Sequence, residues 1–328
     1  MKKSLKAFMR GIIDYAGLFP PARLPLDAAI HNFIQYRQES DSWMLSRFII
    51  PASRLEELEA YREALSAGEE PFRFSVLGET SEAADGFAGK VEAALQHCLH
   101  FHEVFGEHVS TDVLEIKLPE EAVRVNDIGM LEELLADAAR LAGASVLLPG
   151  YIFYEVAPGQ NRESDPETVI RAISNHNKTN AGRYGSYYHA GFKLRCGGVE
   201  AGAFPSPEQV AYALNRARDY KVPVKCTAGL HHPVRHFDES LQATMHGFFN
   251  VFGGAMLAHA HNLSDEELEE ILHEEDPEQF MFSNEAFSWN GLSVSAHEME
   301  QLRATALISY GSCSFDEPRE DLRELELL

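Results

Sequence analysis

The chain has 328 residues, of which 45% are hydrophobic and 24% are charged, so it can bury a full core and is not disordered overall. Asp and Glu number 51 against 28 Lys and Arg, which gives a formal net charge of −23. A surface with this charge repels phosphate backbones and anionic membranes, so we expect neither a nucleic-acid partner nor a membrane. Four cysteines without a C-x-x-C pair indicate neither a disulfide framework nor a structural zinc site, and we expect a cytoplasmic protein.

Short apolar segments alternate with helical patterns along the chain. Strands are predicted at residues 11–15, 47–50, 72–77, 113–118, 145–148, 192–195, 222–226 and 280–283. Helices are predicted at residues 26–37, 54–67, 81–103, 127–142, 166–179, 207–220, 241–259, from 264 onward, 296–310 and 316–328.

Strands that alternate with helices form right-handed βαβ units and a parallel sheet. Eight such units in a chain of this length predict a (βα)8 TIM barrel of the α/β class, with an open doubly wound sheet as the alternative. Residues 305–310 could form a ninth strand, but we favour the end of the helix 296–310, with Gly311 as its C-cap. Because the sequence has no repeat and no linker, we expect residues 1–328 to form a single domain.

Several predicted strands carry charged side chains where a strand buried on both faces would be apolar. Residues two apart lie on the same face of a strand, so Glu115 shares a face with Lys117, Lys193 with Arg195, and Lys225 with Thr227. Strand 11–15 ends near Asp14, and strand 280–283 is followed by Asn284 and Glu285. The alternative is that these side chains point outward and pair with helices. An outward charge would have to be desolvated under a helix, so we favour an inward cluster at the mouth of the barrel.

Clustered cations suit an anionic ligand, so the expected partner is a small phosphorylated or carboxylated metabolite. Gly197 and Gly198 follow strand 192–195, and Gly229 follows strand 222–226. Glycine lets backbone N–H groups approach an oxyanion, and such loops can cradle phosphate. The predicted substrate-binding residues are Lys117, Arg195, Thr227, Gly197, Gly198, Gly229, His231, Asp14 and Asn284.

The segments Phe192-Lys193-Leu-Arg195-Cys-Gly197 and Val224-Lys225-Cys-Thr227-Ala-Gly229 resemble the two lysine strands of the class I aldolase barrels, the deoxyribose-phosphate aldolase type in particular. The resemblance covers about fifteen residues. It implies an aldolase-like lyase in which Lys193 forms a Schiff base and Lys225 is the second lysine of the site.

The chain departs from this family at several positions. Arg195 stands where a small polar residue is expected, Glu115 and Lys117 stand where the family has an Asp, and His231-His232-Pro233 is foreign to it. The resemblance therefore argues for the barrel more than for that reaction.

A lysine is a nucleophile only when its amine is neutral, and burial or neighbouring cations lower its pKa. We expect Lys193, beside Arg195 and Lys225, to have such a lowered pKa, with Glu115 or Glu285 as the general acid or base. The predicted catalytic residues are Lys193, Lys225, Glu115 and Glu285.

His231 and His232 point in different directions in an extended segment, so one of them at most faces a given ligand. A metal would need further ligands such as Glu285, Asp14 or Glu155, and their spacing matches no known motif. We therefore predict no cofactor and no metal. The alternatives are a metal-dependent barrel hydrolase or isomerase that uses a histidine with Glu285, and a non-catalytic anion-binding barrel. The sequence does not determine whether the chain forms a homo-oligomer.

Overall fold

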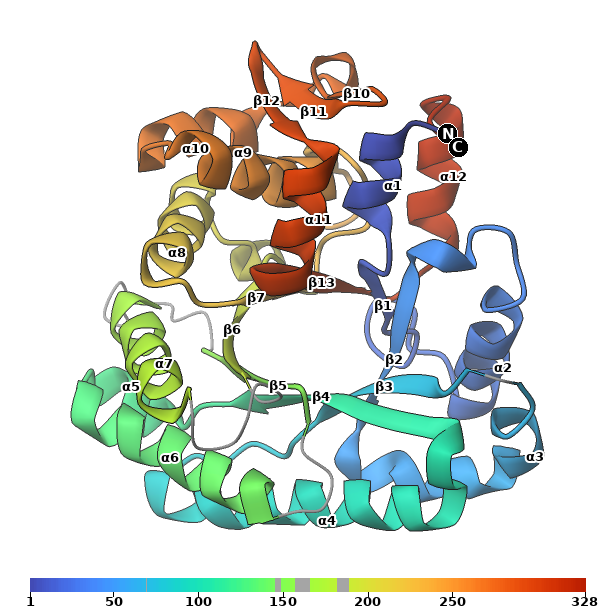
Figure 1. Ribbon diagram of the computed structural model, residues 1–328, viewed down its shortest axis with the longest axis vertical. Coiled ribbons are helices and arrows are strands. Elements are labelled where there is room, and N and C mark those ends of the chain that lie inside the picture. Colours follow the sequence, from blue (N-terminus) through green and yellow to red (C-terminus); the bar gives the residue numbers. More distant parts are fainter. Residues whose placement is uncertain (69, 145–148, 157–165, 182–188) are drawn as a thin grey trace. The chain divides into compact units, whose positions relative to one another are not determined.

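The computed structural model describes residues 1–68, 70–144, 149–156, 166–181 and 189–328. In this part of the chain, eight strands close into a barrel in the order β1-β13-β7-β6-β5-β4-β3-β2 (Figure 1). The pairs β1–β13, β13–β7, β6–β5, β5–β4, β4–β3 and β3–β2 are parallel. The predicted (βα)8 barrel is confirmed. The barrel strands are β1 (Ile13–Tyr15), β2 (Leu45–Pro51), β3 (Phe72–Leu77), β4 (Val109–Lys117), β5 (Tyr151–Glu155), β6 (His189–Arg195), β7 (Val224–Thr227) and β13 (Leu307–Ser312).

Helices lie between most of the barrel strands, and those at residues 26–36, 87–105, 128–144, 166–180 and 207–220 match predicted helices. The α-helices are α1 (Lys3–Met9), α2 (Leu26–Tyr36), α3 (Arg62–Leu65), α4 (Phe87–Phe105), α5 (Glu120–Val125), α6 (Ile128–Ala144), α7 (Pro166–Asn180), α8 (Pro207–Tyr220), α9 (Gly254–His261), α10 (Asp265–His273), α11 (Ala296–Thr305) and α12 (Asp316–Glu324). Most of the predicted helix 54–67 is a 3₁₀ helix, Ala52–Tyr61. Ser264 and Ser295 cap α10 and α11 through capping boxes with Glu267 and Glu298.

The contacts within the chain group it into two compact units. Unit 1 contains Met1–Ser46, Leu194–Asp219 and Val224–Leu328, and unit 2 contains Arg47–Lys193 and Tyr220–Pro223. The organisation of residues 1–328 as a single domain stays a prediction.

In unit 2 the two faces of the sheet differ in chemistry. Phe74 on β3 packs edge-on against Phe101 of α4, with ring centroids 5.1 Å apart, so this face lies under the helix. The register of β4, β5 and β6 aligns Lys117 with Glu155 and Glu155 with Lys193. Aligned residues of neighbouring strands share a face, so these three charged side chains form one row across the sheet.

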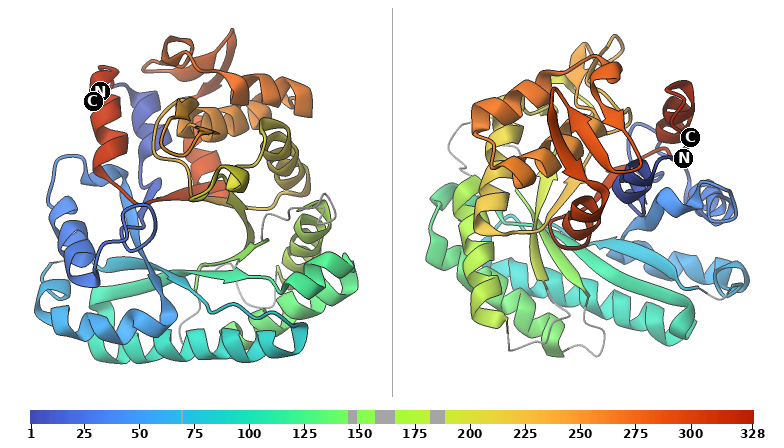
Figure 2. Two further views of the ribbon diagram at one scale, coloured as in Figure 1. Left: turned by 180° about the vertical axis from the view of Figure 1, so that it is seen from behind. Right: turned by 45° about the horizontal axis from the view of Figure 1, so that its top comes forward.

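Unit 1 holds β1, β13 and β7 together with elements outside the barrel. A hairpin pairs β8 (His236–Asp238) with β9 (Ala243–Met245). A small antiparallel sheet contains β10 (Met281–Phe282), β11 (Ala286–Trp289) and β12 (Leu292–Ser295), and β12 packs beside α9 (orange in Figure 2). The core beside this small sheet is aromatic, because the rings of Phe8, Phe249, Phe282 and Phe287 pack edge-on or tilted at centroid distances of 4.9–5.6 Å.

The prediction that residues 280–283 form the eighth barrel strand was wrong. Phe282 lies on β10 and packs into the aromatic core just described, whereas the barrel is completed by β13. The residues of β13 are all buried, and α11 ends at Thr305 with Ala306 as its C-cap, so Gly311 is not a helix cap. A short apolar run fits a buried helix turn and a buried strand equally well, which is why periodicity did not separate them.

Two further predicted elements differ from the structure. The fifth strand is Tyr151–Glu155, and the predicted strand 145–148 lies outside the described residues. The predicted helix 241–259 is divided into β9, a π-helical segment Phe249–Gly253 and α9. Asn250 explains this interruption in part, because its side-chain amide donates to the carbonyl oxygens of Ile271 and Glu274, both at 2.8 Å, while its Oδ1 accepts from the Arg235 backbone N–H.

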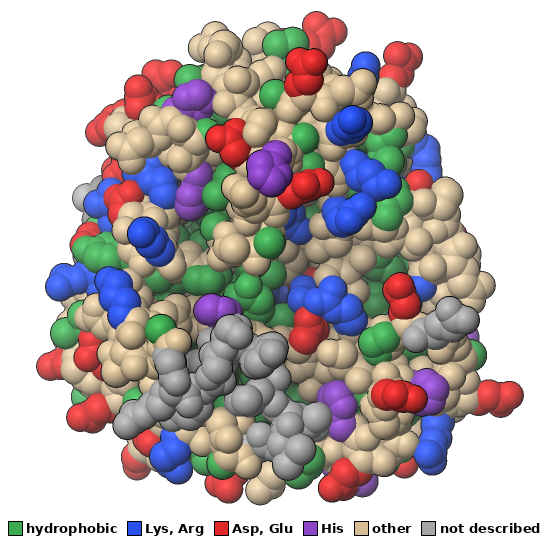
Figure 3. Space-filling model, in the orientation of Figure 1, with side chains coloured by type: hydrophobic (Ala, Val, Ile, Leu, Met, Phe, Trp, Pro, Cys, Tyr) green, Lys and Arg blue, Asp and Glu red, His purple; other side chains and the backbone are tan. Residues whose placement is uncertain are grey.

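No helix within the described residues combines the length and the apolar character needed to cross a membrane. On the face that Figure 3 draws, acidic and basic side chains lie interspersed.

Gly191 tests the packing of unit 2. A Cβ atom at Gly191 would lie 2.4 Å from the Phe153 ring and 2.9 Å from the Pro223 carbonyl oxygen. We expect Gly191→Ala to lower the free energy of unfolding by about 1–3 kcal/mol through overpacking. Gly89 in α4 has no atom within 4 Å of such a Cβ, so Gly89→Ala should raise that free energy by up to about 1 kcal/mol. Urea unfolding of both variants measures the contrast, and equal effects would contradict it.

Candidate functional site

Lys193 on β6 lies between two carboxylates in unit 2. Its Nζ is 2.6 Å from Glu115 Oε2 and 2.6 Å from Glu155 Oε2. The three residues are 6%, 2% and 9% exposed, so the cluster is nearly dry. Ser75 on β3 donates a hydrogen bond from its Oγ to the other Glu115 oxygen. The structure therefore brings together two of the predicted catalytic residues, Lys193 and Glu115.

The alternation of the strands explains why these side chains meet. Glu155 lies directly beside Lys193 in the register of β5 and β6, and Glu115 lies one row earlier, aligned with Phe153 and Gly191. The long lysine side chain reaches both rows. The Phe153 ring occupies the space beside Gly191, where any side chain would collide with it.

The charge state of Lys193 differs from the expectation. Burial lowers the pKa of this amine, but the charges of Glu115 and Glu155 and their hydrogen bonds outweigh burial and raise the pKa above its usual range. The expected lowering was wrong because the nearest groups are two carboxylates rather than cations. Lys193 is accordingly an ammonium at neutral pH, in a cluster with more negative than positive groups.

Lys117 continues the same row toward solvent. Its side chain is 29% exposed, and its Nζ lies 3.1 Å from Glu120, whose side chain is 73% exposed. An exposed pair of this kind is weak, so Lys117 can exchange Glu120 for another anion at little cost.

Lys225 belongs to a second buried ion cluster, which lies in unit 1. Lys225 and Asp14 are fully buried, and Lys225 Nζ donates to Asp14 Oδ2. Ser309 on β13 donates to the same Asp14 oxygen at 2.7 Å and lies 3.4 Å from Lys225 Nζ. Ser309 is beside Lys225 in the register of β13 and β7, so all three side chains share one face of the sheet.

Close packing of the backbone also accounts for the glycines that were predicted to bind phosphate. Gly229 has φ +72°, and a Cβ there would lie 3.0 Å from the Gly197 Cα and from the Cys196 carbonyl oxygen. The segments after β6 and β7 thus approach each other closely, which is possible because Gly197 and Gly229 have no side chains. Arg195 and Thr227 are half-buried at the ends of these strands, and Gly198 follows Gly197. Anion binding by these residues stays a prediction.

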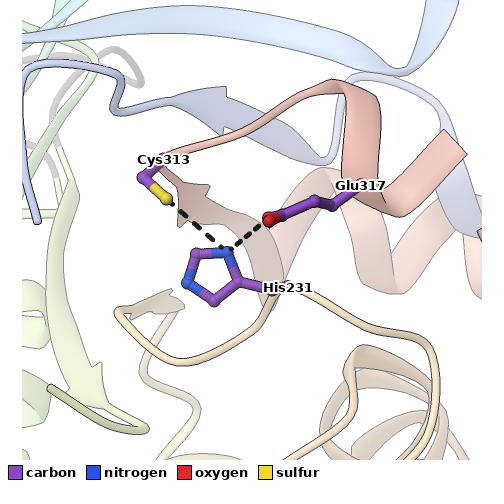
Figure 4. A group of neighbouring side chains, drawn as sticks. All are labelled: His231, Cys313 and Glu317. Atoms are coloured by element: carbon purple, nitrogen blue, oxygen red, sulfur yellow. Dashed lines mark hydrogen bonds and ion pairs between the residues drawn. The ribbon is translucent and has the colours of Figure 1, made fainter. Parts of the chain in front are cut away.

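His231 lies in a different cluster, which Figure 4 shows. Its Nδ1 is 3.1 Å from Glu317 Oε2 and 3.7 Å from Cys313 Sγ. Burial lowers the pKa of His231, but hydrogen bonds to Cys313 and Glu317 outweigh burial and raise it to about 9. His232 points elsewhere: its Nδ1 is 2.7 Å from Asp321, and it lines a separate cavity of about 270 Å³. The two histidines therefore diverge, as expected.

Asn284 and Glu285 do not lie at a barrel strand. Both are exposed in the turn between β10 and β11, where Asn284 Oδ1 accepts a hydrogen bond from the Lys3 backbone N–H at 3.3 Å. Their placement at the barrel mouth followed from the incorrect eighth strand, and this correction removes the reason for assigning them a role in the site.

Five residues of these clusters were not predicted as site residues: Ser75, Ser309, Cys313, Glu317 and Glu155. Ser75 and Ser309 are small polar residues within apolar strands, which is a weak signal. Cys313 and Glu317 follow β13, which was interpreted as the end of a helix. Glu155 was considered only as a metal ligand, although a carboxylate at the end of a strand is the same signal that identified Glu115.

Removing the lysine tests the Lys193 cluster. We expect Lys193→Met to lower the free energy of unfolding by about 3–5 kcal/mol, because it leaves Glu115 and Glu155 buried without a cation. Lys117→Met, in the same row but in an exposed pair, should change that free energy by about 0–1 kcal/mol. Guanidinium unfolding at pH 8 measures both, and similar losses would show that the buried ion pairs of Lys193 stabilise the fold no more than the exposed pair of Lys117.

The same variant has a characteristic pH dependence. Since folding raises the pKa of Lys193, its stabilisation is complete below the unfolded value of about 10.5 and is lost only above it. In Lys193→Met, repulsion and burial instead raise the pKa values of the two carboxyl groups, so the folded variant gains a proton as the pH falls. The stability difference between the two proteins should therefore shrink from pH 8 to pH 5. A difference that is constant over this range would contradict the assignment.

Comparison with known proteins adds no family to this description. No protein-family model matches the chain, and no curated protein matches it at a significant level.

Proposed function

We propose that this protein is a barrel enzyme that acts on a small anionic carbonyl metabolite, with a lyase-like reaction centred on Lys193. The observation that carries the proposal is the buried ammonium held 2.6 Å from each of two carboxylates. An isolated buried charge is costly, and perturbed groups of this kind concentrate at functional sites. The position of Lys193 on a barrel strand supports the same conclusion, because barrel sites are built at strand ends.

The cluster contains the groups that carbonyl chemistry requires. An ammonium in a dry site can donate a hydrogen bond to a carbonyl oxygen and stabilise the enolate that forms when a proton or a carbon substituent leaves the neighbouring carbon. A carboxylate beside it can accept or return the proton. We assign Lys193 to the carbonyl oxygen and Glu155 or Glu115 to proton transfer.

Lys117 supplies a place for the anionic end of the substrate. It lies in the same row as Lys193 with β5 between them, which separates the two backbones by about 10 Å. A phosphate or carboxylate at Lys117 and a carbonyl at Lys193 fit a metabolite of a few carbon atoms.

The raised pKa of Lys193 favours the ammonium role over the Schiff base that the aldolase resemblance implies. A Schiff base needs the neutral amine to attack the carbonyl carbon and water to leave. Lys193 would first have to transfer a proton to one of its carboxylates. We therefore take the non-covalent role as the conclusion and the covalent role as an outcome of the test.

The test is proton exchange. We would incubate the protein with a panel of three- to five-carbon sugar phosphates and 2-oxo acids in D₂O and follow loss of the protons next to the carbonyl by ¹H NMR. Lys193→Met and Glu155→Gln should slow exchange by about 10²- to 10⁴-fold. Lys117→Met should raise KM with a much smaller change in kcat, because it removes binding of the anion only.

Three results decide between the alternatives. Borohydride treatment that leaves Lys193 unmodified, with exchange intact, supports the non-covalent role, whereas an adduct on Lys193 establishes the Schiff base. Ligand-induced thermal stabilisation without exchange or turnover would show a non-catalytic anion-binding barrel. Exchange that persists in Lys193→Arg and Lys193→Met alike would remove Lys193 from the reaction.

A further inference from the structure

We propose that His231, Cys313 and Glu317 form a binding site for a divalent transition-metal ion, with Zn²⁺ as the best match. The three residues lie in unit 1, and the site does not depend on the lysine chemistry proposed above. Within the described residues, they are the group of histidine, cysteine and acidic side chains whose ligand atoms converge, all within 4.8 Å of one another (Figure 4).

The spacing of the ligand atoms suits a tetrahedral ion. Bonds of about 2.0–2.3 Å at tetrahedral angles place neighbouring ligand atoms about 3.3–3.7 Å apart. His231 Nδ1 is 3.1 Å from Glu317 Oε2 and 3.7 Å from Cys313 Sγ. The ligand atoms of Cys313 and Glu317 lie within 4.8 Å of each other, so an ion that binds all three residues draws this last pair together by up to about 1 Å.

The arrangement is unlike a nucleophilic triad. In a cysteine–histidine–acid relay, the thiol contacts one ring nitrogen and the carboxylate contacts the other. Here both groups approach the same nitrogen, Nδ1 of His231. Three ligand atoms directed at one region of space are what an ion requires and what a proton relay does not.

The chemistry of the three groups selects the class of ion. Thiolate and imidazole are poor ligands for Mg²⁺ and Ca²⁺, which prefer oxygen, and good ligands for Zn²⁺ and its neighbours. Three protein ligands leave the fourth tetrahedral position for water or substrate, as in catalytic rather than structural zinc sites.

The position of the cluster agrees with an open site. His231 follows β7, Cys313 follows β13 directly, and these strands are parallel neighbours, so both ligands come from the carboxyl ends of barrel strands. His231 and Cys313 are 8% and 7% exposed, whereas the Glu317 side chain is 47% exposed. Solvent thus reaches the cluster from the side of Glu317, while the thiol and the imidazole are protected.

Cobalt provides the test, because a Co²⁺–thiolate bond has a charge-transfer absorption that other ligands do not give. Protein depleted of metal with a chelator is titrated with Co²⁺ and then with Zn²⁺. We expect about one Co²⁺ per chain with a near-ultraviolet charge-transfer band, full displacement by Zn²⁺, and a higher Tm with Zn²⁺. Absence of the band at saturating Co²⁺ would overturn the proposal.

Variants with matched controls assign the ligands. Cys313→Ser should abolish the band, and Glu317→Gln should weaken Co²⁺ binding by about tenfold or more while leaving the band. Glu320→Gln, an exposed acid on the same helix, and His232→Gln, the neighbouring histidine, should bind Co²⁺ as the unmodified protein does. Because Glu317 is exposed, Glu317→Gln is expected to fold normally even if Cys313→Ser does not. Unchanged affinity in Glu317→Gln, or equal losses in the two controls, would contradict the assignment.

Discussion

The pairing of buried lysines with carboxylates is the constraint on which the interior of this barrel depends. Lys193 and Lys225 lie on strands whose other residues are largely apolar. Glu155 on the adjacent β5 and Glu115 on β4 hold Lys193, and Asp14 on β1, two strands from β7, holds Lys225. A charge in such surroundings is tolerated only with a partner and with its remaining hydrogen bonds satisfied. The strand register must therefore hold without any slip, since a shift of a single position would turn each charge to the other face of the sheet.

The alternation of polar residues within apolar strands made much of this predictable. Glu115 and Lys193 were placed on inward faces from sequence spacing alone, and the structure joins them. The sequence could not indicate which carboxylates would surround which lysine, because that depends on register between strands far apart in the chain. The direction of the Lys193 pKa shift was mispredicted for the same reason, because Arg195 and Lys225 were assumed to be its neighbours and Glu155 was not.

The last barrel strand was harder to predict, and its incorrect assignment also changed the set of predicted site residues. Leu307–Ser312 is uniformly buried and follows a helix without a glycine or proline to mark the boundary, so it was interpreted as helix. Residues 280–283 looked like a strand and are in part a strand, but in a small sheet with its own aromatic core. Assigning them to the barrel brought Asn284 and Glu285 into the predicted site and left Cys313 and Glu317 out. Local pattern specifies that a strand forms, whereas tertiary packing decides which sheet it joins.

The first turn of α12 contacts two other parts of unit 1, the His231 cluster and the segment around the end of α2. Glu317 lies beside His231, while its neighbours Asp316 and Arg319 contact Tyr36 and Glu39 at the end of α2. These residues lie on one helical turn, so the same turn holds the Glu317 carboxylate beside His231 and joins the last helix to Tyr36 and Glu39. Loss of this turn would therefore remove both sets of contacts at once.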